Sequence, residues 1–276
     1  MKNLRIGFIW IATIVVSIYL MICIGLYFCQ ERLIFHPLEL DKDYTFSFEN
    51  KWNEVFIDLT DGKKLHGLLF KSDSSKGLIF YLHGNAGNLA SWGEAASAYT
   101  DLGYDVFMLD YRGYGKSEGT IESQEQLFHD VQIAYDSLKT KYYESDIVIL
   151  GYSIGTGIAS SIAARNTPRI LILQAPFYSM SDMMEKQFSF IPKFLLRYEF
   201  PNNEFLKKCT IPVVIFHGRD DEIIPYESSE RLLKETQTID SLIALPFQGH
   251  NGMTDNPDYR IGVAEILKKY EGKSGQ

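Results

Sequence analysis

Apolar residues are arranged along this chain in one long run, several short runs and a few stretches with helical spacing. The long run extends from Ile6 to Phe28, covers 23 residues and contains no charge. As a helix it would be roughly 34 Å long, and a bilayer's hydrocarbon core is about 30 Å thick. A secretory signal has a shorter apolar segment that ends in small residues, which this run lacks. The pattern therefore predicts an uncleaved transmembrane anchor over residues 1–30, rather than a cleaved signal or a buried helix.

Beyond a predicted juxtamembrane linker at residues 31–52, short apolar runs alternate with stretches of helical period. Asp61 and Gly62, a pair typical of hairpin turns, separate predicted antiparallel strands at 54–59 and 64–70. The later apolar runs predict buried strands at 78–82, 105–109, 146–150, 169–173, 212–216 and 241–245. The stretches between and after them predict helices at 88–99, 123–139, 154–165, 226–236 and 258–270. Such alternation indicates an α/β fold, with a mostly parallel sheet that has helices on both faces.

One interval, residues 177–209, breaks this alternation and is rich in methionine and phenylalanine. We interpret it as a short cap within a single domain that covers residues 53–272. Two roles remain open for the cap. Its apolar side chains could simply pack helices on the core, or they could form a pocket for an acyl chain, because flexible methionine suits adaptable apolar surfaces. In the second case we expect a pocket lined by Tyr152, Phe177, Met180 and Met184.

Composition and charge narrow the class of partner. The chain has 276 residues, of which 46% are hydrophobic, enough for one large core. The formal net charge is −8 and no basic block occurs, which argues against a nucleic-acid partner. Cys23 and Cys29 lie in or at the edge of the apolar run and leave Cys209 alone in the rest of the chain, so we expect no internal disulfide. The oligomeric state stays open.

Charges beside the apolar run indicate its orientation. Lys2 and Arg5 precede the run, and acidic residues outnumber Arg32 and Lys42 just after it. The positive-inside rule, which counts basic residues, then favours a cytoplasmic N-terminus. We therefore expect a single-pass membrane protein whose main domain lies on the non-cytoplasmic side.

The most informative motif is the pentapeptide from Gly151 to Gly155, which follows the apolar run 147–150 and has the form G-x-S-x-G. A serine hydroxyl is a poor nucleophile unless a sharp turn exposes it beside a base. The two glycines permit such a turn, because side chains at their positions would collide with the neighbouring strand and helix. The motif predicts Ser153 as a nucleophile.

A serine nucleophile needs a base that accepts its proton and a carboxylate that orients the base. His250, in a loop after the last predicted strand, is the candidate base. Asp221 follows a buried strand and is the favoured carboxylate, with its neighbour Asp220 as the rival. The order serine, aspartate, histidine along the chain is the order expected of α/β hydrolases.

Backbone N–H groups should stabilise the oxyanion that forms when a serine attacks a carbonyl group. One donor is expected from Ile154, at the start of the helix after the nucleophile, and the other from Asn85 in the turn His83-Gly84-Asn85. Asp110 and Arg112 are expected to order a loop rather than to take part in chemistry. The remaining histidines have no second ligand at metal-binding spacing, and the glycine motifs lack the spacing of nucleotide-binding loops, so we expect no metal and no cofactor.

Five ordered motifs give the chain a family resemblance: HGNAGN, DYRGYGKSEG, GYSIG, HGRDDEIIP and GHN. Across about residues 53–270 it resembles the α/β-hydrolase superfamily. More narrowly, it is similar to the membrane-anchored serine hydrolases of the α/β-hydrolase-domain family, which carry a segment like QERLIFHP after an N-terminal span. The resemblance implies triad roles for Ser153, Asp221 and His250. It departs from the family pattern at Phe247-Gln248, where a second glycine is common.

The combined expectation is a membrane-anchored serine hydrolase that cleaves carboxylic esters or thioesters of lipid-like acyl substrates through an acyl-enzyme, with no cofactor. The nearest alternative is a serine aminopeptidase of the same fold, which would need acidic residues for the substrate amine. The cap offers four acidic residues for that role: Asp182, Glu185, Glu199 and Glu204. A further alternative is an inactive scaffold or binding module, but such proteins usually lack a triad member.

Overall fold

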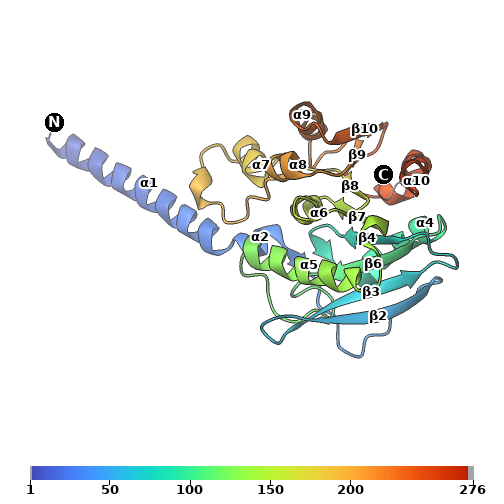
Figure 1. The fold of residues 1–276 in the computed structure, drawn as a ribbon. Coiled ribbons are helices and arrows are strands. Elements are labelled where there is room, and N and C mark those ends of the chain that lie inside the picture. Colours follow the sequence, from blue (N-terminus) through green and yellow to red (C-terminus); the bar gives the residue numbers. More distant parts are fainter. Residues whose placement is uncertain (1, 273–276) are drawn as a thin grey trace.

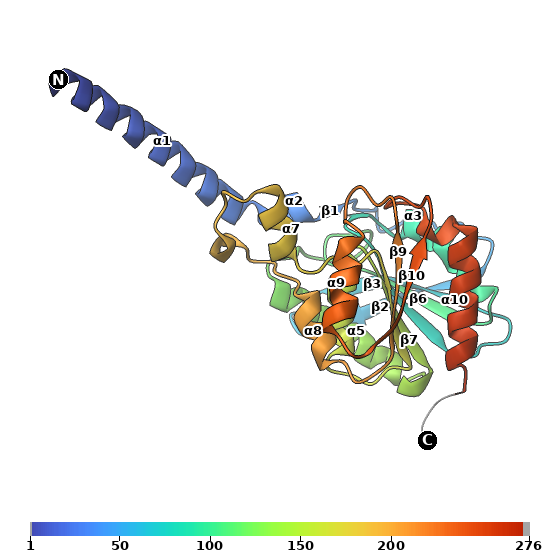
Figure 2. The ribbon, with the colours of Figure 1, turned by 90° about the horizontal axis from the view of Figure 1, so that it is seen from above.

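A long apolar helix, α1 (Lys2–Phe28), projects from the body of the molecule (Figures 1 and 2). In the computed structural model, which describes residues 2–272, nearly all of its apolar side chains are exposed. The stretch Asn3–Phe28 is long and apolar enough to cross a membrane. The helix begins a few residues before the predicted span, because the polar N-terminal residues continue the same helical turns.

An eight-stranded sheet forms the centre of the body, in the strand order β10-β9-β8-β7-β4-β6-β3-β2. The hairpin strands β2 and β3 at one edge pair antiparallel with each other, β3 also pairs antiparallel with β6, and all other pairings in this sheet are parallel. The predicted mixed sheet with a leading hairpin is therefore confirmed. Its strands are β2 (Lys51–Asp58), β3 (Lys64–Lys71), β4 (Leu78–Leu82), β6 (Asp105–Asp110), β7 (Ile147–Tyr152), β8 (Ile170–Gln174), β9 (Val213–Gly218) and β10 (Ile239–Leu245).

Helices cover both faces of this sheet and create two apolar layers. Successive strand residues point to opposite faces, so Phe80 of β4 joins one layer and Tyr81 joins the other. The first layer packs against α5 (Gln124–Lys139), α6 (Ile154–Ala163), α8 (Asn202–Lys208) and α9 (Glu227–Glu235). The second packs against α3 (Leu89–Trp92), α4 (Ser97–Thr100) and α10 (Pro257–Tyr270). The central strands are buried on both faces, which explains their continuous apolar sequences.

The helix predicted at 88–99 is divided by a 3₁₀ turn at Gly93–Ala96. Gly93 lies directly against the Phe48 ring, where a Cβ atom would come within 2.4 Å of a ring carbon. A close contact with a residue so distant in sequence leaves no trace in local periodicity. The sequence therefore predicted the helical content here but not the division.

The segment predicted as a linker, residues 31–52, packs along the body. It begins within α2 (Gln30–Ile34) and continues as β1 (His36–Pro37), which pairs in parallel with β5 (Ala86–Gly87). Farther along, Phe46 is buried and stacks on the His66 ring. Helix α1 is thus joined to the body by ordered structure.

The cap contains α7 (Met180–Gln187), a 3₁₀ turn at Lys193–Leu195 and α8. It lies beside the end of α1 that is nearest the body (Figures 1 and 2). The Tyr19 hydroxyl donates a hydrogen bond of 2.9 Å to the Phe190 carbonyl oxygen, so the cap also touches α1 well before the helix ends.

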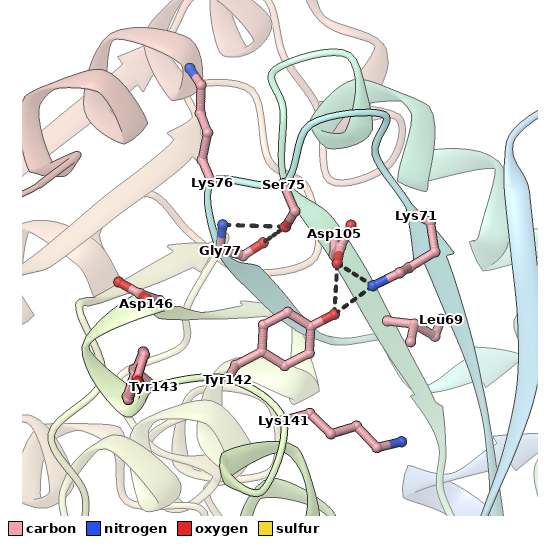
Figure 3. Close-up of a pocket in the computed structure, with 10 residues that line it drawn as sticks. All are labelled: Leu69, Lys71, Ser75, Lys76, Gly77, Asp105, Lys141, Tyr142, Tyr143 and Asp146. Atoms are coloured by element: carbon pink, nitrogen blue, oxygen red, sulfur yellow. Dashed lines mark hydrogen bonds and ion pairs between the residues drawn. The ribbon is translucent and has the colours of Figure 1, made fainter.

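A polar cluster lies beside the N-terminal ends of the parallel strands β4, β6 and β7 (Figure 3). It borders a cavity of about 490 Å³. The buried Asp105 carboxylate accepts hydrogen bonds from Lys71 Nζ at 2.6 Å, the Tyr142 hydroxyl at 2.6 Å and the Ser72 amide at 2.9 Å. Burial alone would raise the pKa of Asp105, but these hydrogen bonds outweigh burial and lower the pKa. The cluster therefore has a structural explanation.

We expect Asp105→Ala to lower the free energy of unfolding by about 2–3 kcal/mol, because it leaves Lys71 and Tyr142 without their buried acceptor. Asp73→Ala is the matched control, since Asp73 forms an exposed ion pair with Lys51 at 2.9 Å and such pairs add little stability. Urea unfolding of the full-length protein in detergent measures both variants. Equal unfolding midpoints for the two would contradict a structural role for Asp105.

Candidate active site

Ser153 lies in a sharp turn between β7 and α6. Its backbone has φ of 53° and ψ of −119°, a left-handed conformation that is unusual for a residue other than glycine. Such strain persists only where the surrounding structure fixes it. The Ser153 side chain stays partly accessible, although the residues on both sides are buried.

The two glycines of the motif make this turn possible by allowing three backbones to approach closely. A Cβ atom at Gly151 would lie 2.5 Å from the Gly155 carbonyl oxygen, and a Cβ atom at Gly155 would lie 2.1 Å from the Leu82 carbonyl oxygen. Both distances are far below van der Waals contact. Any larger residue at Gly155 would push α6 away from β4 and shift the turn that carries Ser153.

The structure brings Ser153, His250 and Asp221 into one hydrogen-bonded chain. His250 Nε2 lies 3.0 Å from Ser153 Oγ, and His250 Nδ1 lies 2.8 Å from Asp221 Oδ2. An ionised carboxylate only accepts hydrogen bonds, so Nδ1 carries the proton and Nε2 is free to accept one from the serine hydroxyl. Asp220, the rival carboxylate, is exposed and outside this chain of contacts.

The Asp221 carboxylate is held by several donors. Its Oδ1 accepts hydrogen bonds from the amides of Ile223 at 2.9 Å and Ile224 at 2.7 Å. Its Oδ2 lies 3.3 Å from Nε2 of the buried His217. Burial alone would raise the pKa of Asp221, but the contacts with His217, His250 and the Ile224 amide outweigh burial and hold the pKa well below its usual range. Asp221 is therefore ionised at neutral pH and can stabilise a positively charged imidazole.

His250 is also positioned through its backbone. Its amide donates to Glu222 Oε2 at 3.2 Å, and its carbonyl oxygen accepts a hydrogen bond from the Tyr152 hydroxyl. The loop before it contains Phe247, which has φ of 56° and a side chain that is 93% exposed. Phe247 thus adopts the left-handed conformation that a glycine would take without strain.

The turn His83-Gly84-Asn85, which we call the Asn85 turn, is fixed by partners from distant segments. The Asn85 carbonyl oxygen accepts hydrogen bonds from the His36 amide at 2.9 Å and the Tyr114 hydroxyl at 2.6 Å. The Asn85 side-chain amide donates to the Ile34 carbonyl oxygen at 3.3 Å. Within residues 2–272, the backbone amides of Asn85 and Ile154 donate to no protein acceptor, so both remain available to a ligand.

Asp110 is a buried carboxylate behind the Asn85 turn, and we expected it only to order a loop. Asp110 Oδ1 accepts a hydrogen bond from the Leu89 amide at 3.2 Å and lies 3.5 Å from His83 Nε2. The other member of that pair, Arg112, binds Asp130 at 2.5 and 3.0 Å and Asp61 at 2.7 Å. Both side chains therefore tie loops to the body.

The sequence analysis did not identify His217 as a residue that supports Asp221. The signal that could have revealed this role is the position of His217 at the end of β9, the strand that leads to Asp221.

The four residues expected to line one substrate pocket lie in three different places within residues 2–272. Met180 and Met184 line an apolar cavity of about 570 Å³ between the cap and the anchor. Tyr152 lines a smaller one of about 170 Å³ beside Asn251. Phe177 is 2% exposed, belongs to the core and packs its ring against Phe200. Phe177 faces inward because it still belongs to the layer of side chains under α6.

Three of the four acidic cap residues already have basic partners. Asp182 lies 2.6 Å from Arg231, Glu185 lies 2.6 Å from Lys193, and Glu204 lies 3.2 Å from Lys207. Paired carboxylates are less available to bind the free amine of a peptide. Glu199 is exposed and stays open for that role.

We expect Gly155→Ala to destabilise the protein by about 3 kcal/mol, because the added methyl group collides with the β4 backbone. Gly25→Ala is the control, since a Cβ atom there meets nothing within 4 Å. The measurement is the free energy of unfolding in urea, together with the yield of folded protein. Equal stability of the two variants would contradict the close packing around Ser153.

The depressed pKa of Asp221 predicts a pH dependence of stability. A carboxylate whose pKa is lower in the folded state contributes stability above its unfolded pKa of about 3.9, and this contribution is lost as pH falls toward the folded-state value. We expect Asp221→Asn to flatten the acid limb of a stability–pH profile below about pH 5, and Asp220→Asn to leave it unchanged. Parallel profiles for the wild type and Asp221→Asn would contradict this assignment.

Comparisons with known proteins agree with this architecture. A family model described as "Serine aminopeptidase, S33" matches residues 73–203. An uncharacterized protein of Mycobacterium tuberculosis is 30% identical over 227 residues, which cover 80% of both chains. Lysophosphatidylserine lipase ABHD12 of Macaca fascicularis is 28% identical over 73% of this chain and 57% of its own length.

Solved structures show the same fold at low sequence identity. An esterase of Pyrococcus furiosus is 18% identical, with a TM-score of 0.68 over 87% of this chain and 98% of its own. Est1E of Butyrivibrio proteoclasticus is 19% identical, with a TM-score of 0.65 over 80% of this chain and 99% of its own. The strand order, the turn at Ser153 and these relatives lead to one conclusion: the chain belongs to the α/β-hydrolase superfamily.

Proposed function

We propose that this protein is a serine hydrolase that cleaves carboxylic esters or thioesters of lipid-like acyl substrates through an acyl-enzyme intermediate. The observation that carries the proposal is the hydrogen-bonded chain from Ser153 Oγ through His250 to Asp221, with contacts of 3.0 and 2.8 Å. Those three groups supply a nucleophile, a base and a carboxylate that orients the base. With water as the second reactant, these groups provide the nucleophile and the proton transfers of ester hydrolysis.

In the first half of the reaction, Ser153 Oγ attacks the acyl carbon while its proton passes to His250 Nε2. The tetrahedral intermediate then collapses, the bond to the leaving oxygen or sulfur breaks, and His250 donates the proton to that atom. In the second half, His250 takes a proton from water, the resulting hydroxide attacks the acyl carbon, and the proton returns to Ser153 as the acid leaves. Asp221 keeps the imidazole oriented and stabilises its charged form throughout.

We assign stabilisation of the oxyanion to the backbone amides of Asn85 and Ile154. Both amides lack a protein acceptor within the described residues, and Ile154 begins α6, where the helix dipole favours negative charge. Loss of one such donor typically slows a reaction by about 10²–10³-fold.

Several features support an acyl ester of a lipid as the substrate. The apolar helix α1 can hold the domain at a bilayer, and the apolar cavity that contains Met180 and Met184 suits a hydrocarbon chain. The named activities of the relatives, an esterase and a lysophosphatidylserine lipase, are of the same chemical class.

We also propose that α1 is a signal anchor and that the domain, residues 53–272, lies on the non-cytoplasmic side, because basic residues precede the span.

The second candidate is a serine aminopeptidase, which the description of the matching family favours. Against it, Asp182, Glu185 and Glu204 are already paired with basic side chains. Amide substrates therefore form part of the test.

Activity-based labelling with a fluorophosphonate tests the nucleophile directly. We expect wild-type protein to be labelled and Ser153→Ala to be unlabelled, with hydrolysis of p-nitrophenyl butyrate lowered by about 10⁴-fold or more. We expect Asp221→Asn to lower kcat strongly, because the imidazole would lose its orienting carboxylate, and the adjacent control Asp220→Asn to retain near-normal activity.

Three outcomes would contradict the proposal. Labelling that survives Ser153→Ala would exclude this serine as the nucleophile, and wild-type protein that is never labelled would indicate an inactive binding module. Faster cleavage of aminoacyl p-nitroanilides than of p-nitrophenyl esters would favour the aminopeptidase.

A further inference from the structure

The apolar cavity between the anchor and the cap has walls from two very different parts of the chain. Its volume is about 570 Å³, within the range of about 300–1,000 Å³ that is usual for ligand sites. One wall comes from the last turns of α1 and from α2, and the other from α7 and the segment that follows it. Its lining includes Ile22, Leu26, Ile34, Met180, Met184 and Ile191. We call it the anchor–cap cavity.

The contacts of the cap with α1 indicate the depth of this cavity relative to a bilayer. Tyr19, which binds the Phe190 carbonyl oxygen, precedes the end of α1 at Phe28 by nine residues, or about 14 Å of helix. If α1 crosses the membrane, this part of the cap reaches the level of the hydrocarbon chains.

Side chains on this part of the cap suit an apolar medium. Phe188, Phe190 and Phe194 are 47%, 62% and 83% exposed. Exposed aromatic clusters of this kind mark surfaces that contact a membrane or a partner. Because these side chains lie beside α1, we expect them to contact lipid.

Polar contacts join α2 to the cap beside the cavity, where Gln30 and Leu195 belong to its lining. The Gln30 side chain donates to the Leu195 carbonyl oxygen at 2.6 Å and accepts from the Arg197 amide at 2.8 Å. Glu31 accepts from the Tyr198 hydroxyl at 2.9 Å and pairs with Arg197 at 2.6 Å. These contacts join α2 to the cap, so the two walls are held as one unit.

Both walls also lead to the catalytic edge of the sheet. On one side, Ile34 lines the cavity and its carbonyl oxygen accepts the hydrogen bond from the Asn85 side chain. On the other side, Met180 follows Gln174 by six residues, and the Gln174 carbonyl oxygen accepts from the Ser153 amide at 3.0 Å. At Ile34, the wall of the cavity is thus one hydrogen bond away from the Asn85 turn.

We propose that the anchor–cap cavity binds one hydrocarbon chain of a membrane lipid, which enters sideways from the leaflet and directs its acyl carbonyl group toward the Asn85 turn. Hydrolysis of that lipid rests on the proposed function, whereas binding of the chain does not need Ser153. The transmembrane helix then forms part of the substrate site in addition to its role as an anchor. Selectivity for long acyl chains follows from the same geometry.

The test fills the cavity in full-length protein held in phosphatidylcholine nanodiscs. Met184→Trp adds a large ring to the lining, and Phe194→Trp is the matched control, because Phe194 belongs to the same segment but does not line the cavity. We expect Met184→Trp to lower the laurate-to-acetate ratio of kcat/KM for the p-nitrophenyl esters by about tenfold or more. Phe194→Trp should leave the laurate-to-acetate ratio near that of the wild type.

A second measurement does not depend on catalysis. A palmitate analogue with a photoactivatable diazirine should crosslink to peptides around residues 22–34 and 180–191 in Ser153→Ala, and Met184→Trp should reduce this crosslinking in the same background. Site-specific crosslinking without any ester hydrolysis by the wild type would refute the proposed function and support the lipid site. An unchanged laurate-to-acetate ratio in Met184→Trp, or crosslinking spread evenly along α1, would overturn the lipid site.

Discussion

The close approach of α6 to β4 at Gly155 is the constraint on which the candidate site depends. Because no side chain separates the two backbones, the first turn of α6 lies directly over the sheet, and Ser153 is held in its left-handed conformation. The same contact places the Ile154 amide beside the end of β4, which leads into the Asn85 turn. The close packing at Gly155 therefore sets the positions of both the nucleophile and one proposed oxyanion donor.

Local sequence was sufficient to predict the individual strands and the turn at Ser153, because both depend on patterns among near neighbours in sequence. Continuous apolar strands and paired glycines leave clear patterns. The network around Asp110 could not be predicted, because its partners His83 and Leu89 come from a distant loop that the fold brings close. The amides of Ile223 and Ile224 are near Asp221 in sequence, but only the folded turn directs them at its carboxylate. The sequence favoured Asp221 over Asp220, but only the geometry separates them, since both follow the same strand.

The least predictable region was residues 31–52, which looks like a polar linker. Its order depends on contacts across about fifty residues, such as the bond between His36 and Asn85. The predicted substrate pocket was only partly correct for a similar reason. Phe177 and Met180 are near neighbours in sequence, but Phe177 faces the core and Met180 lines the cavity beside the cap. Composition identified an apolar cap without revealing that α1 completes its cavity.

The pairing of β1 with β5 has a consequence for cleavage of the chain between α1 and the body. A protease that cut the chain between α1 and the body could leave behind a soluble fragment with an intact sheet. A cut beyond Pro37, however, would remove the amide of His36 and the carbonyl group of Ile34, both of which hold Asn85. Such cleavage would therefore loosen the Asn85 turn at the same moment as it separated the domain from α1, so the candidate site is complete only in molecules that retain α2 and β1.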